Sequence, residues 1–543
     1  MPVDAHDPTR RHVVTGGLAA AVLGATSSAT VQQVHAAGVV FHDRGKTGIR
    51  AVGDPGIADV MVSNGVDVTL TDGQGQWQLP ARAGEPIFVI KPSDWSLPIG
   101  TNGLPVLSNR IDTATALEAI DFALRRDVEP RRFDVALLAD TQPQTMQELG
   151  YLRDSVLSAV VDTGAAFAIN HGDIVFDRPD LHARYLDLIA STAMPWHHCP
   201  GNHDMNAGGP AACFETWKAT FGPCHYAFQY GGATFILLNN VARLPQGDLT
   251  AGGYNYVGRI GREQLTFVEG VLRHVPRDSL IVVSMHIPLV AWEDPLEPSG
   301  FTADRQALLA LLSGRPNTLS LAGHTHTTEH HYLGPADGFS GPGQHHHHVL
   351  TAACGSWWSG PFDAAGQPIA MSRDGTPKGF HVLEVDGAGY RTRLVPVGHS
   401  GSAHMRISLE GRDAAGTDDP PRRIRLSPCV TTGDCAATLV AVNVFDGGPK
   451  TRLAGRIIGR TRAGEQLEQA LALAHTAMPD VAVDELYLLH RAQLKPWVET
   501  SPSSHIWRAA LPRLPAGTYA VHIDGRDAYG GAMRSNLLLE VVG

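Results

Sequence analysis

Residues 318–326 read T-L-S-L-A-G-H-T-H, an apolar run that ends in two histidines one residue apart. Histidine makes up 27 of the 543 residues, so one such pair is weak evidence for a site. An imidazole at the end of a buried strand is costly unless it has a polar partner. The decisive question is whether other apolar runs also end in groups that could serve as partners.

Four further runs between residues 130 and 397 do so, and they lead directly to Asp140, Asp173, Asn202 and His286. Helical patterns near 180–192, 263–275 and 303–313 separate several of them, and another places Leu149, Leu152, Val156, Leu157 and Val160 on one face. Apolar strands alternating with amphipathic helices predict an α/β domain whose sheet is covered on both faces. The carboxyl ends of its strands would then form one crevice.

The side chains expected in this crevice predict a metal site. Carboxylate, amide and imidazole ligands without thiolates suit Zn, Fe or Mn. Two ions that share one carboxylate require six to eight protein ligands, and the chain offers about that number. Any one of these residues alone would more often be a hydrogen-bonded core group or a helix cap.

The order of these blocks resembles the calcineurin-like metallophosphoesterase superfamily over roughly residues 133–360. The blocks are Asp140-Thr141-Gln142, Gly172-Asp173-Ile174-Val175, Gly201-Asn202-His203-Asp204, the lone His286, and Gly323-His324-Thr325-His326. Residues 221–228 (F-G-P-C-H-Y-A-F), 355–360 (G-S-W-W-S-G) and 442–447 (V-N-V-F-D-G) resemble a bacterial subfamily with a β domain on each side of the core. The family usually carries histidine where this chain has Gln142.

The resemblance implies a site with two divalent or trivalent metal ions, Mn, Fe or Zn. One ion would be held by Asp140, Gln142, Asp173 and His326, and the other by Asp173, Asn202, His286 and His324, so that Asp173 bridges them. A deprotonated water between the ions is the expected nucleophile. Because an amide oxygen is a weaker donor than imidazole for Zn or Fe, Gln142 leaves the occupancy of the first position open.

The same resemblance gives His203 the role of general acid, and Asp204 or Asp177 could orient it. For those two aspartates a capping or surface role is the favoured interpretation. Trp357, Trp358, Tyr226 and His225 are the residues expected to line the substrate cleft. For the tryptophan pair a plain core position is an equally good explanation.

The predicted fold class is α/β, a metallophosphoesterase-type β-sandwich core covered by helices and flanked by two β domains. Residues 38–125 alternate with Asn-Gly and Asp-Gly turns, which predicts a transthyretin-like β-sandwich. The phosphoesterase domain is expected at 130–397 and a β-rich domain at 400–543, with one helix near 463–474. The run His345–His348 is expected in a surface loop.

Residues 1–37 are predicted to be a twin-arginine signal peptide. Arg10 and Arg11 precede a weakly apolar Ala/Gly-rich stretch, and small residues follow at 36–37. The expected location is therefore periplasmic or secreted. Cys429 with Cys435, or Cys213 with Cys224, could form disulfides there.

Composition and charge limit the kinds of partner that the protein is expected to bind. A net charge of −11, with no long basic run, argues against nucleic acid, and no other window reaches the length of a membrane-spanning helix. The leading hypothesis is an exported phosphoesterase acting on small-molecule or envelope phosphate mono- or diesters. Alternatives are another dinuclear hydrolase, such as a peptidase or amidase, and a non-catalytic metal- or envelope-binding protein with a relic core.

Overall fold

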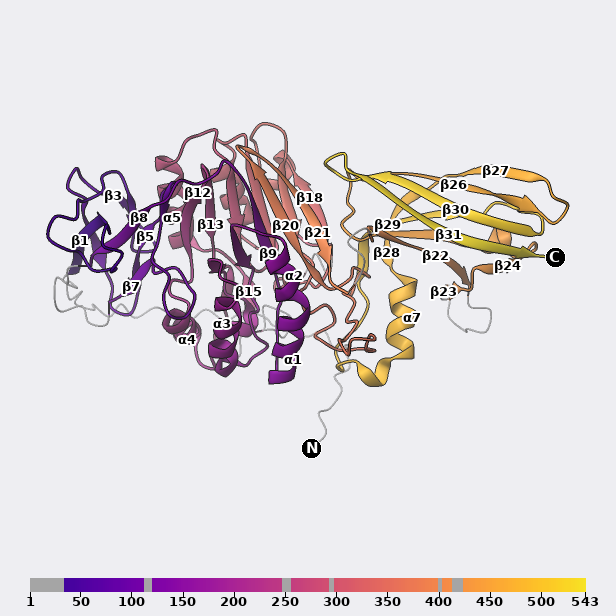
Figure 1. Ribbon diagram of the computed structural model, residues 1–543, viewed down its shortest axis with the longest axis horizontal. Coiled ribbons are helices and arrows are strands. Elements are labelled where there is room, and N and C mark those ends of the chain that lie inside the picture. Colours follow the sequence, from indigo (N-terminus) through magenta and orange to yellow (C-terminus); the bar gives the residue numbers. More distant parts are fainter. Residues whose placement is uncertain (1–33, 112–119, 247–254, 293–296, 399–402, 413–422) are drawn as a thin grey trace, which may run out of the picture. The chain divides into compact units, whose positions relative to one another are not determined.

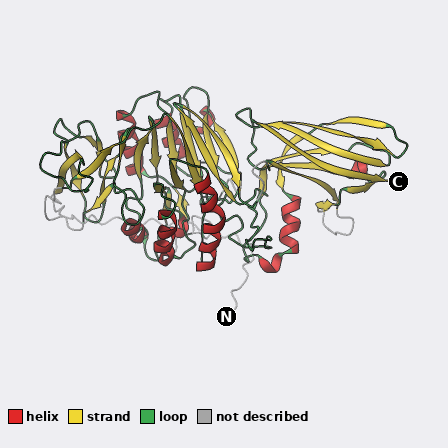
Figure 2. Cartoon of the chain, in the orientation of Figure 1, coloured by secondary structure: helices red, strands yellow, loops and turns green. Residues whose placement is uncertain are grey.

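The computed structural model describes residues 34–111, 120–246, 255–292, 297–398, 403–412 and 423–543. Of the predicted signal peptide, residues 1–33 lie outside this part, and residues 34–37 form the beginning of strand β1. The element arrangement of the described residues is shown in Figure 1 and their secondary structure in Figure 2.

The N-terminal module consists of two four-stranded sheets, in the orders β4-β1-β8-β6 and β3-β2-β5-β7. Alternating burial along β4, where Trp77 and Leu79 are buried, turns one face of each sheet toward a shared interior. The strands are β1 Val34–His42, β2 Met61–Ser63, β3 Val68–Leu70, β4 Gln76–Ala81, β5 Pro86–Ile90, β6 Trp95–Ser96, β7 Ser108–Arg110 and β8 Phe122–Arg126.

The core is built on two sheets whose central strands are parallel. The first has the order β11-β10-β9-β20-β21 and the second β12-β13-β16-β17-β19-β18. The first comprises β9 Arg132–Leu138, β10 Phe167–Asn170, β11 Trp196–His198, β20 Gly379–Asp386 and β21 Gly389–Pro396. The second comprises β12 Tyr226–Tyr230, β13 Ala233–Leu237, β16 Ile281–Ser284, β17 Thr318–Ala322, β18 Glu329–Leu333 and β19 His345–Val349.

Both faces of the first sheet are buried along its parallel strands, as the continuous apolar runs predict, whereas the edge strand β21 is partly exposed. Along β9, Val135 and Leu137 belong to the apolar cluster shared with the second sheet, whereas Ala136 and Leu138 pack with the helical layer. The helices of the core are α1 Met146–Tyr151, a π-helical turn Leu152–Leu157, α2 Ser158–Asp162, α3 His182–Ala190, α4 Glu215–Thr220, α5 Arg262–His274 and α6 Arg305–Leu312. A two-stranded ribbon pairs β14 Val241–Arg243 with β15 Tyr256–Gly258. The predicted class of core is confirmed.

The C-terminal domain is a sandwich of two five-stranded sheets, in the orders β23-β22-β25-β29-β28 and β24-β31-β30-β26-β27. Its apolar interior includes Val442, Trp507 and Tyr519. The strands are β22 Met405–Arg412, β23 Arg423–Leu426, β24 Cys429–Thr431, β25 Leu439–Val444, β26 Arg452–Thr461, β27 Gln466–Leu471, β28 Ala474–Pro479, β29 Pro502–Ala510, β30 Gly517–Arg526 and β31 Ala532–Val542.

Two local predictions were wrong. The helix expected near 463–474 is instead the strand β27, which pairs with β26, and the helix of this domain is α7 Val481–Leu489. Sheet pairing overrides the helical preference of Q-L-E-Q-A-L. The run His345–His348 is strand β19 and is fully buried, because it lies between β17 and β18 in the second core sheet.

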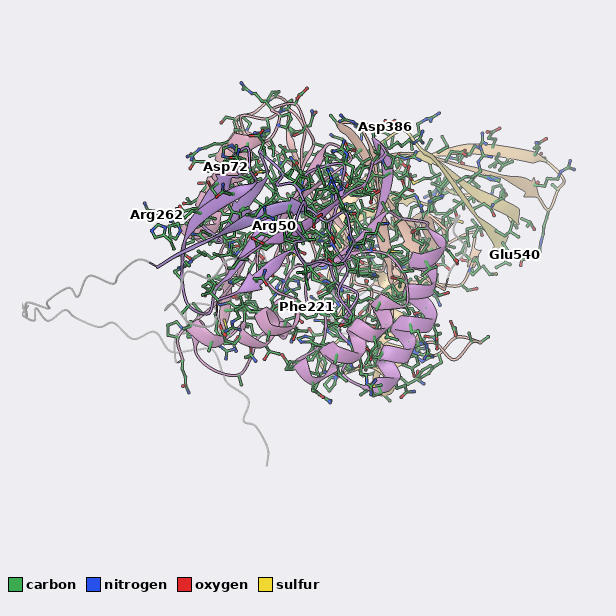
Figure 3. The ribbon with its side chains drawn as sticks, turned by 60° about the vertical axis from the view of Figure 1, so that its left-hand side comes forward. Arg50, Asp72, Phe221, Arg262, Asp386 and Glu540 are labelled. Atoms are coloured by element: carbon green, nitrogen blue, oxygen red, sulfur yellow. The ribbon has the colours of Figure 1, made fainter. Side chains whose placement is uncertain are left out.

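The surface carries most of the charge, and labelled side chains such as Arg50, Arg262 and Glu540 are exposed (Figure 3). All six cysteines lie in the described residues and are free thiols, including the two pairs that could have formed disulfides. Among the described helices, none has the length and hydropathy that a membrane span requires.

One buried ion pair joins the N-terminal module to the core. Lys91 Nζ lies 2.5 Å from Glu129 Oε1 and donates to the Gln229 carbonyl at 2.7 Å. The other oxygen of Glu129 accepts from the Gly231 and Asp94 amides. Both charged side chains are therefore compensated, although little water reaches them.

We predict that Lys91→Met lowers the stability of the protein by about 3–5 kcal/mol, because it leaves the Glu129 carboxylate buried without its cation. Chemical denaturation of the two proteins measures the difference. Arg153→Met, which removes an exposed pair with Asp154, should cost less than about 1 kcal/mol. Equal effects of the two substitutions would contradict the structural role of the buried pair.

Candidate metal centre and active site

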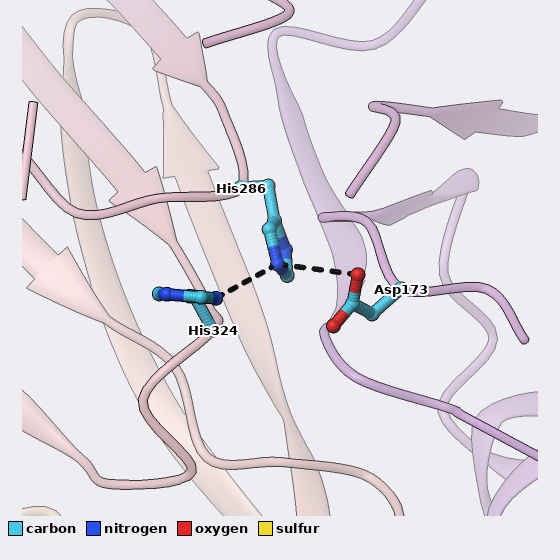
Figure 4. A group of neighbouring side chains, drawn as sticks. All are labelled: Asp173, His286 and His324. Carbon is cyan, nitrogen blue, oxygen red and sulfur yellow. Dashed lines mark hydrogen bonds and ion pairs between the residues drawn. The ribbon is translucent and has the colours of Figure 1, made fainter. Parts of the chain in front are cut away.

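The carboxyl ends of five core strands bring the expected residues together. The first sheet supplies Asp140 and Gln142 after β9, Asp173 after β10, and Asn202 after β11, while the second supplies His286 after β16 and both His324 and His326 after β17. His286 Nε2 lies 3.3 Å from Asp173 Oδ1, 3.0 Å from Asn202 Oδ1 and 3.2 Å from His324 Nδ1. Figure 4 shows the His286 ring between the other two side chains of this central group, Asp173 and His324.

Five of the seven expected metal ligands have left-handed backbone conformations. Their φ angles are 52° at Asp140, 39° at Gln142, 52° at Asp173, 77° at His324 and 55° at His326. Such a conformation is uncommon for any residue other than glycine and costs about 1–3 kcal/mol where it is strained. Strain of this kind persists where the surrounding fold enforces it, and it is typical of functional sites.

Two glycines allow the strand ends to approach this closely. A β-carbon on Gly172, whose φ is 92°, would lie 2.6 Å from His286 Nδ1. A β-carbon on Gly323 would lie 2.5 Å from Asp140 Oδ2. The glycines that precede Asp173 and His324 are therefore required by packing inside the site, which explains these parts of the motifs.

The hydrogen bonds of three histidines fix which ring nitrogen faces the site. His286 Nδ1 lies 2.8 Å from the His171 carbonyl, His326 Nδ1 lies 2.7 Å from the Gly355 carbonyl, and His324 Nε2 lies 3.1 Å from the Ser299 carbonyl. A carbonyl only accepts, so each of these nitrogens carries the proton. In the neutral rings of His324 and His326 the remaining nitrogen presents a lone pair to the centre, as histidine ligands of metals do, and His286 would do so after its Nε2 loses a proton.

Asp173 is the most strongly compensated group of the site. Its Oδ1 accepts from the His203 amide at 2.9 Å, and its Oδ2 lies 2.6 Å from Gln142 Nε2. Burial acts to raise the pKa of Asp173, but the positive charges of His286 and His203 outweigh it and hold the pKa below its usual range. The same attraction overcomes burial at His286 and raises its pKa to about 9.

Asp140 lacks such compensation. Its Oδ2 accepts from the His324 amide at 2.9 Å, but its buried Oδ1 has no hydrogen-bond donor among the described residues. Burial raises the pKa of Asp140 to about 7. A buried carboxylate oxygen without a donor, beside imidazole lone pairs, matches the ligand set of a metal ion, so the residues present fit the expected cations.

His203 lies at the edge of this group. Its Nδ1 is 3.0 Å from Asp177 Oδ1, its ring stacks on Phe176 at 4.0 Å, and its Nε2 lies 4.0 Å from Asp173 Oδ2. Burial lowers the pKa of His203, but Asp173 and Asp177 outweigh this effect and raise it above the usual value. Asp177 therefore lies at the surface, as the favoured interpretation predicted, and its carboxylate contacts the His203 ring.

Asp204 has a different role, as the capping interpretation predicted. Its carboxylate accepts from the amides of Ile174 and Gly201, at 3.0 and 2.9 Å. It therefore connects the loop after β10 to the loop after β11 and fixes the positions of Asp173 and Asn202. Among the described residues, the carboxylates next to the His203 ring are those of Asp177 and Asp173, and not that of Asp204.

A cavity of about 370 Å³ lies over the group. It is lined by the ligands Gln142, Asp173, Asn202, His324 and His326, by His203 and Trp357, and by Tyr256, Glu297, Ser299, Gly300, Thr325 and Arg373. Of the expected cleft residues, Trp357 takes this place and stacks on His326 at 4.0 Å. Sequence reasoning missed Tyr256 and Arg373, which stand in no recognisable motif.

The other three expected cleft residues are not among those lining this cavity. Trp358 is buried and donates from Nε1 to the Thr141 carbonyl at 2.7 Å. Tyr226 is buried in β12, where its hydroxyl accepts from the His198 amide. His225 Nε2 bonds to the Gly65 carbonyl of the N-terminal module, so it connects two parts of the fold.

Residues after α7 also reach the site. Trp497 stacks on Phe176 with ring centroids 5.4 Å apart and meets Trp357 edge-on at 6.3 Å. Lys495 Nζ bonds to Gln144 Oε1 at 2.6 Å and to Glu148 Oε1 at 2.9 Å. An aromatic wall formed by Phe176, Trp357 and Trp497 thus combines parts of the chain far apart in sequence, and no local motif predicts it.

Comparison with known proteins agrees with this geometry. Sequence models of the calcineurin-like phosphoesterase match residues 133–328, and models of its N-terminal and C-terminal domains match residues 45–127 and 347–532. The fold and site define a metallophosphoesterase. The chain belongs to the calcineurin-like phosphoesterase family, in the subfamily with three parts, which confirms the resemblance seen in the sequence.

Two solved structures show more distant likeness. A dimetal phosphatase from Danio rerio is 16% identical, with a TM-score of 0.34 and coverage of 48% of this chain and 98% of its own. A purple acid phosphatase from yellow lupin (Lupinus luteus) seeds is 12% identical, with a TM-score of 0.35 and coverage of 63% and 69%. No curated protein sequence matches the chain significantly.

Gln142 offers a test of the first metal position. We predict that Gln142→His increases metal retention after dialysis against a chelator, because imidazole is the stronger donor for Zn and Fe. Metal per chain measured by mass spectrometry gives the result. Gln144→His, two residues further along, is the matched control and should change nothing; equal retention by all three proteins would show that position 142 does not contact an ion.

Proposed function

We propose that the protein is an exported, metal-dependent phosphoesterase that hydrolyses phosphate mono- or diesters. The observation that carries this proposal is the group of histidine ring nitrogens that face the buried carboxylates Asp140 and Asp173. The strained backbone of the same residues supports catalysis over a relic core, because a site without function has no need of that strain.

The ligands divide into two sets that share Asp173. Asp140, Gln142, Asp173 and His326 would hold one ion, and Asp173, Asn202, His286 and His324 the other. Two bound cations would supply an activated water as nucleophile and neutralise charge on the phosphoryl group. Manganese, iron or zinc would suit these ligands.

The remaining residues around the cavity bind and orient the substrate. His203 would give its Nε2 proton to the leaving-group oxygen, while Asp177 accepts from Nδ1 and holds the ring in place. Arg373 lines the cavity and would bind a phosphoryl oxygen. The wall formed by Phe176, Trp357 and Trp497 would contact the organic part of the ester.

Substitutions of Asp173 and His203 should impair the enzyme in different ways. Asp173→Ala should lose metal and nearly all activity together, because it removes the shared ligand. His203→Ala should keep its metal and lose roughly 10²–10⁴-fold in kcat on alkyl phosphates, the usual contribution of general acid–base catalysis. The loss on nitrophenyl esters should be small, because that leaving group departs without a proton.

Metal content and kcat on the paired substrates decide between the roles. Phe176→Leu is the matched control, because it removes the aromatic ring that packs on His203 but keeps His203 itself. Any loss of kcat in this variant should be the same on alkyl and nitrophenyl esters. Equal defects of His203→Ala on both esters would exclude the acid role and assign His203 to substrate binding.

Export should depend on the arginine pair near the N-terminus, because the twin-arginine pathway reads that dipeptide. We predict that the double substitution Arg10→Lys and Arg11→Lys retains the protein in the cytoplasm, as measured by cell fractionation. Substitution of Arg44 and Arg50 in the N-terminal module by lysine is the control. Normal recovery of the first double variant from the periplasm would contradict this route.

A further inference from the structure

A second group of metal-ligand side chains lies where the core meets the C-terminal domain. Asp446, which follows β25, directs one carboxylate oxygen at three histidines of the core strands β18, β19 and β20. Oδ1 of Asp446 lies 3.1 Å from His330 Nε2, 3.4 Å from His348 Nε2 and 3.2 Å from His381 Nε2. None of these four residues belongs to the candidate active site.

The histidine run in β19 supplies this group through the alternation of a strand. His345 and His347 point to one face, where they bond to Thr318 and Ser320. His346 and His348 point to the other, where the His348 ring lies 4.0 Å from that of His330 and 4.6 Å from that of His381. His381 belongs to the opposite sheet, so the three rings meet in the space between the two sheets.

Hydrogen bonding does not account for His348. Its side chain is fully buried, and neither ring nitrogen has a hydrogen-bond partner within the described part of the chain. Leaving such a group unpaired costs about 1–3 kcal/mol, whereas an apolar residue between two sheets would cost nothing of the kind. His330 and His381 each bond to Asp446, so three imidazoles converge on one oxygen that only two of them use.

We propose that His330, His348 and Asp446 form a mononuclear site for a divalent transition metal, of which zinc is the best match. Ligand atoms of a tetrahedral zinc ion at about 2.0–2.1 Å lie roughly 3.3 Å apart, and the distances from Asp446 Oδ1 to His330 Nε2 and His348 Nε2 fall on either side of that value. Two imidazoles and one carboxylate favour zinc over magnesium or calcium.

The surroundings complete the site. His330 Nδ1 lies 2.9 Å from His346 Nε2, and His346 Nδ1 lies 3.1 Å from the Tyr390 hydroxyl. This chain can hold the proton of His330 on Nδ1 and leave Nε2 free to bind the ion. The side chain of Asp446 is 21% exposed. It lines a cavity with His404 and Asp527, through which an ion can enter.

Binding here would join parts of the fold that belong to different sheets. His330 and His348 come from the second core sheet, and Asp446 comes from the C-terminal domain. A metal ion that binds only the folded chain contributes to its stability. The site would therefore attach the C-terminal domain to the end of the core sandwich.

The experiment counts zinc in the full-length protein after chelator treatment, reloading with Zn²⁺ and desalting. Asp446→Asn and His330→Gln should each contain one zinc ion fewer per chain than the unsubstituted protein. His345→Gln is the matched control, because His345 is equally buried in β19 but lies outside the group. Asp446→Asn preserves the shape of a partly exposed side chain, and circular dichroism establishes that each variant is folded.

Crystals of the unsubstituted, zinc-loaded protein provide a second measurement that needs no variant. Anomalous difference density at the zinc edge should appear between His330, His348 and Asp446, separate from any at the active site. Absence of that density would overturn the proposal, as would unchanged zinc content in both folded variants. In either case the group is an ion pair network centred on Asp446 and carries no metal.

Discussion

The whole site depends on the attraction between one buried carboxylate, Asp173, and the positive charge around it. A carboxylate at this depth is tolerated only where charge and donors compensate it. Gln142, the His203 amide and His286 provide that compensation from three other strand ends. Each strand end must therefore approach closely, which is why glycine precedes Asp173 and the loops adopt left-handed turns. The close approach of strand ends that compensates the charge of Asp173 also brings the expected metal ligands together.

Histidines serve three distinct purposes in this molecule. At the active site, carbonyls bind one ring nitrogen of His286, His324 and His326, so the other nitrogen of each ring faces inward. His225 and His345 act as ordinary hydrogen-bonding core residues. The group around Asp446 follows the ligand chemistry of the first set, but lies between sheets and not at strand ends. A high histidine content therefore does not by itself predict a metal site. The hydrogen-bond and charge partners of each histidine ring determine its role.

What could be predicted from the sequence follows from this distinction. Asp140, Asp173, His286 and His324 directly follow apolar strands, so local pattern and fold class together located the crevice. Trp497 and Asp446 could not be found in this way, because their neighbours are set by packing between distant segments. The Gly/Pro-rich stretch around the histidine run predicts a surface loop, and only the pairing with β17 and β18 makes this run a strand. Likewise, Gln466–Leu471 is a strand because it pairs with β26.

The aromatic wall has a consequence for synthesis. Trp497 follows α7, whereas Phe176 and Trp357, on which it packs, belong to the core. Domains generally fold as they leave the ribosome, so the core can assemble while the last segment is still being made. During that interval the crevice lacks Trp497 and the contacts of Lys495. The aromatic wall is complete only after Trp497 has been synthesised, so its assembly lags behind that of the crevice that it borders.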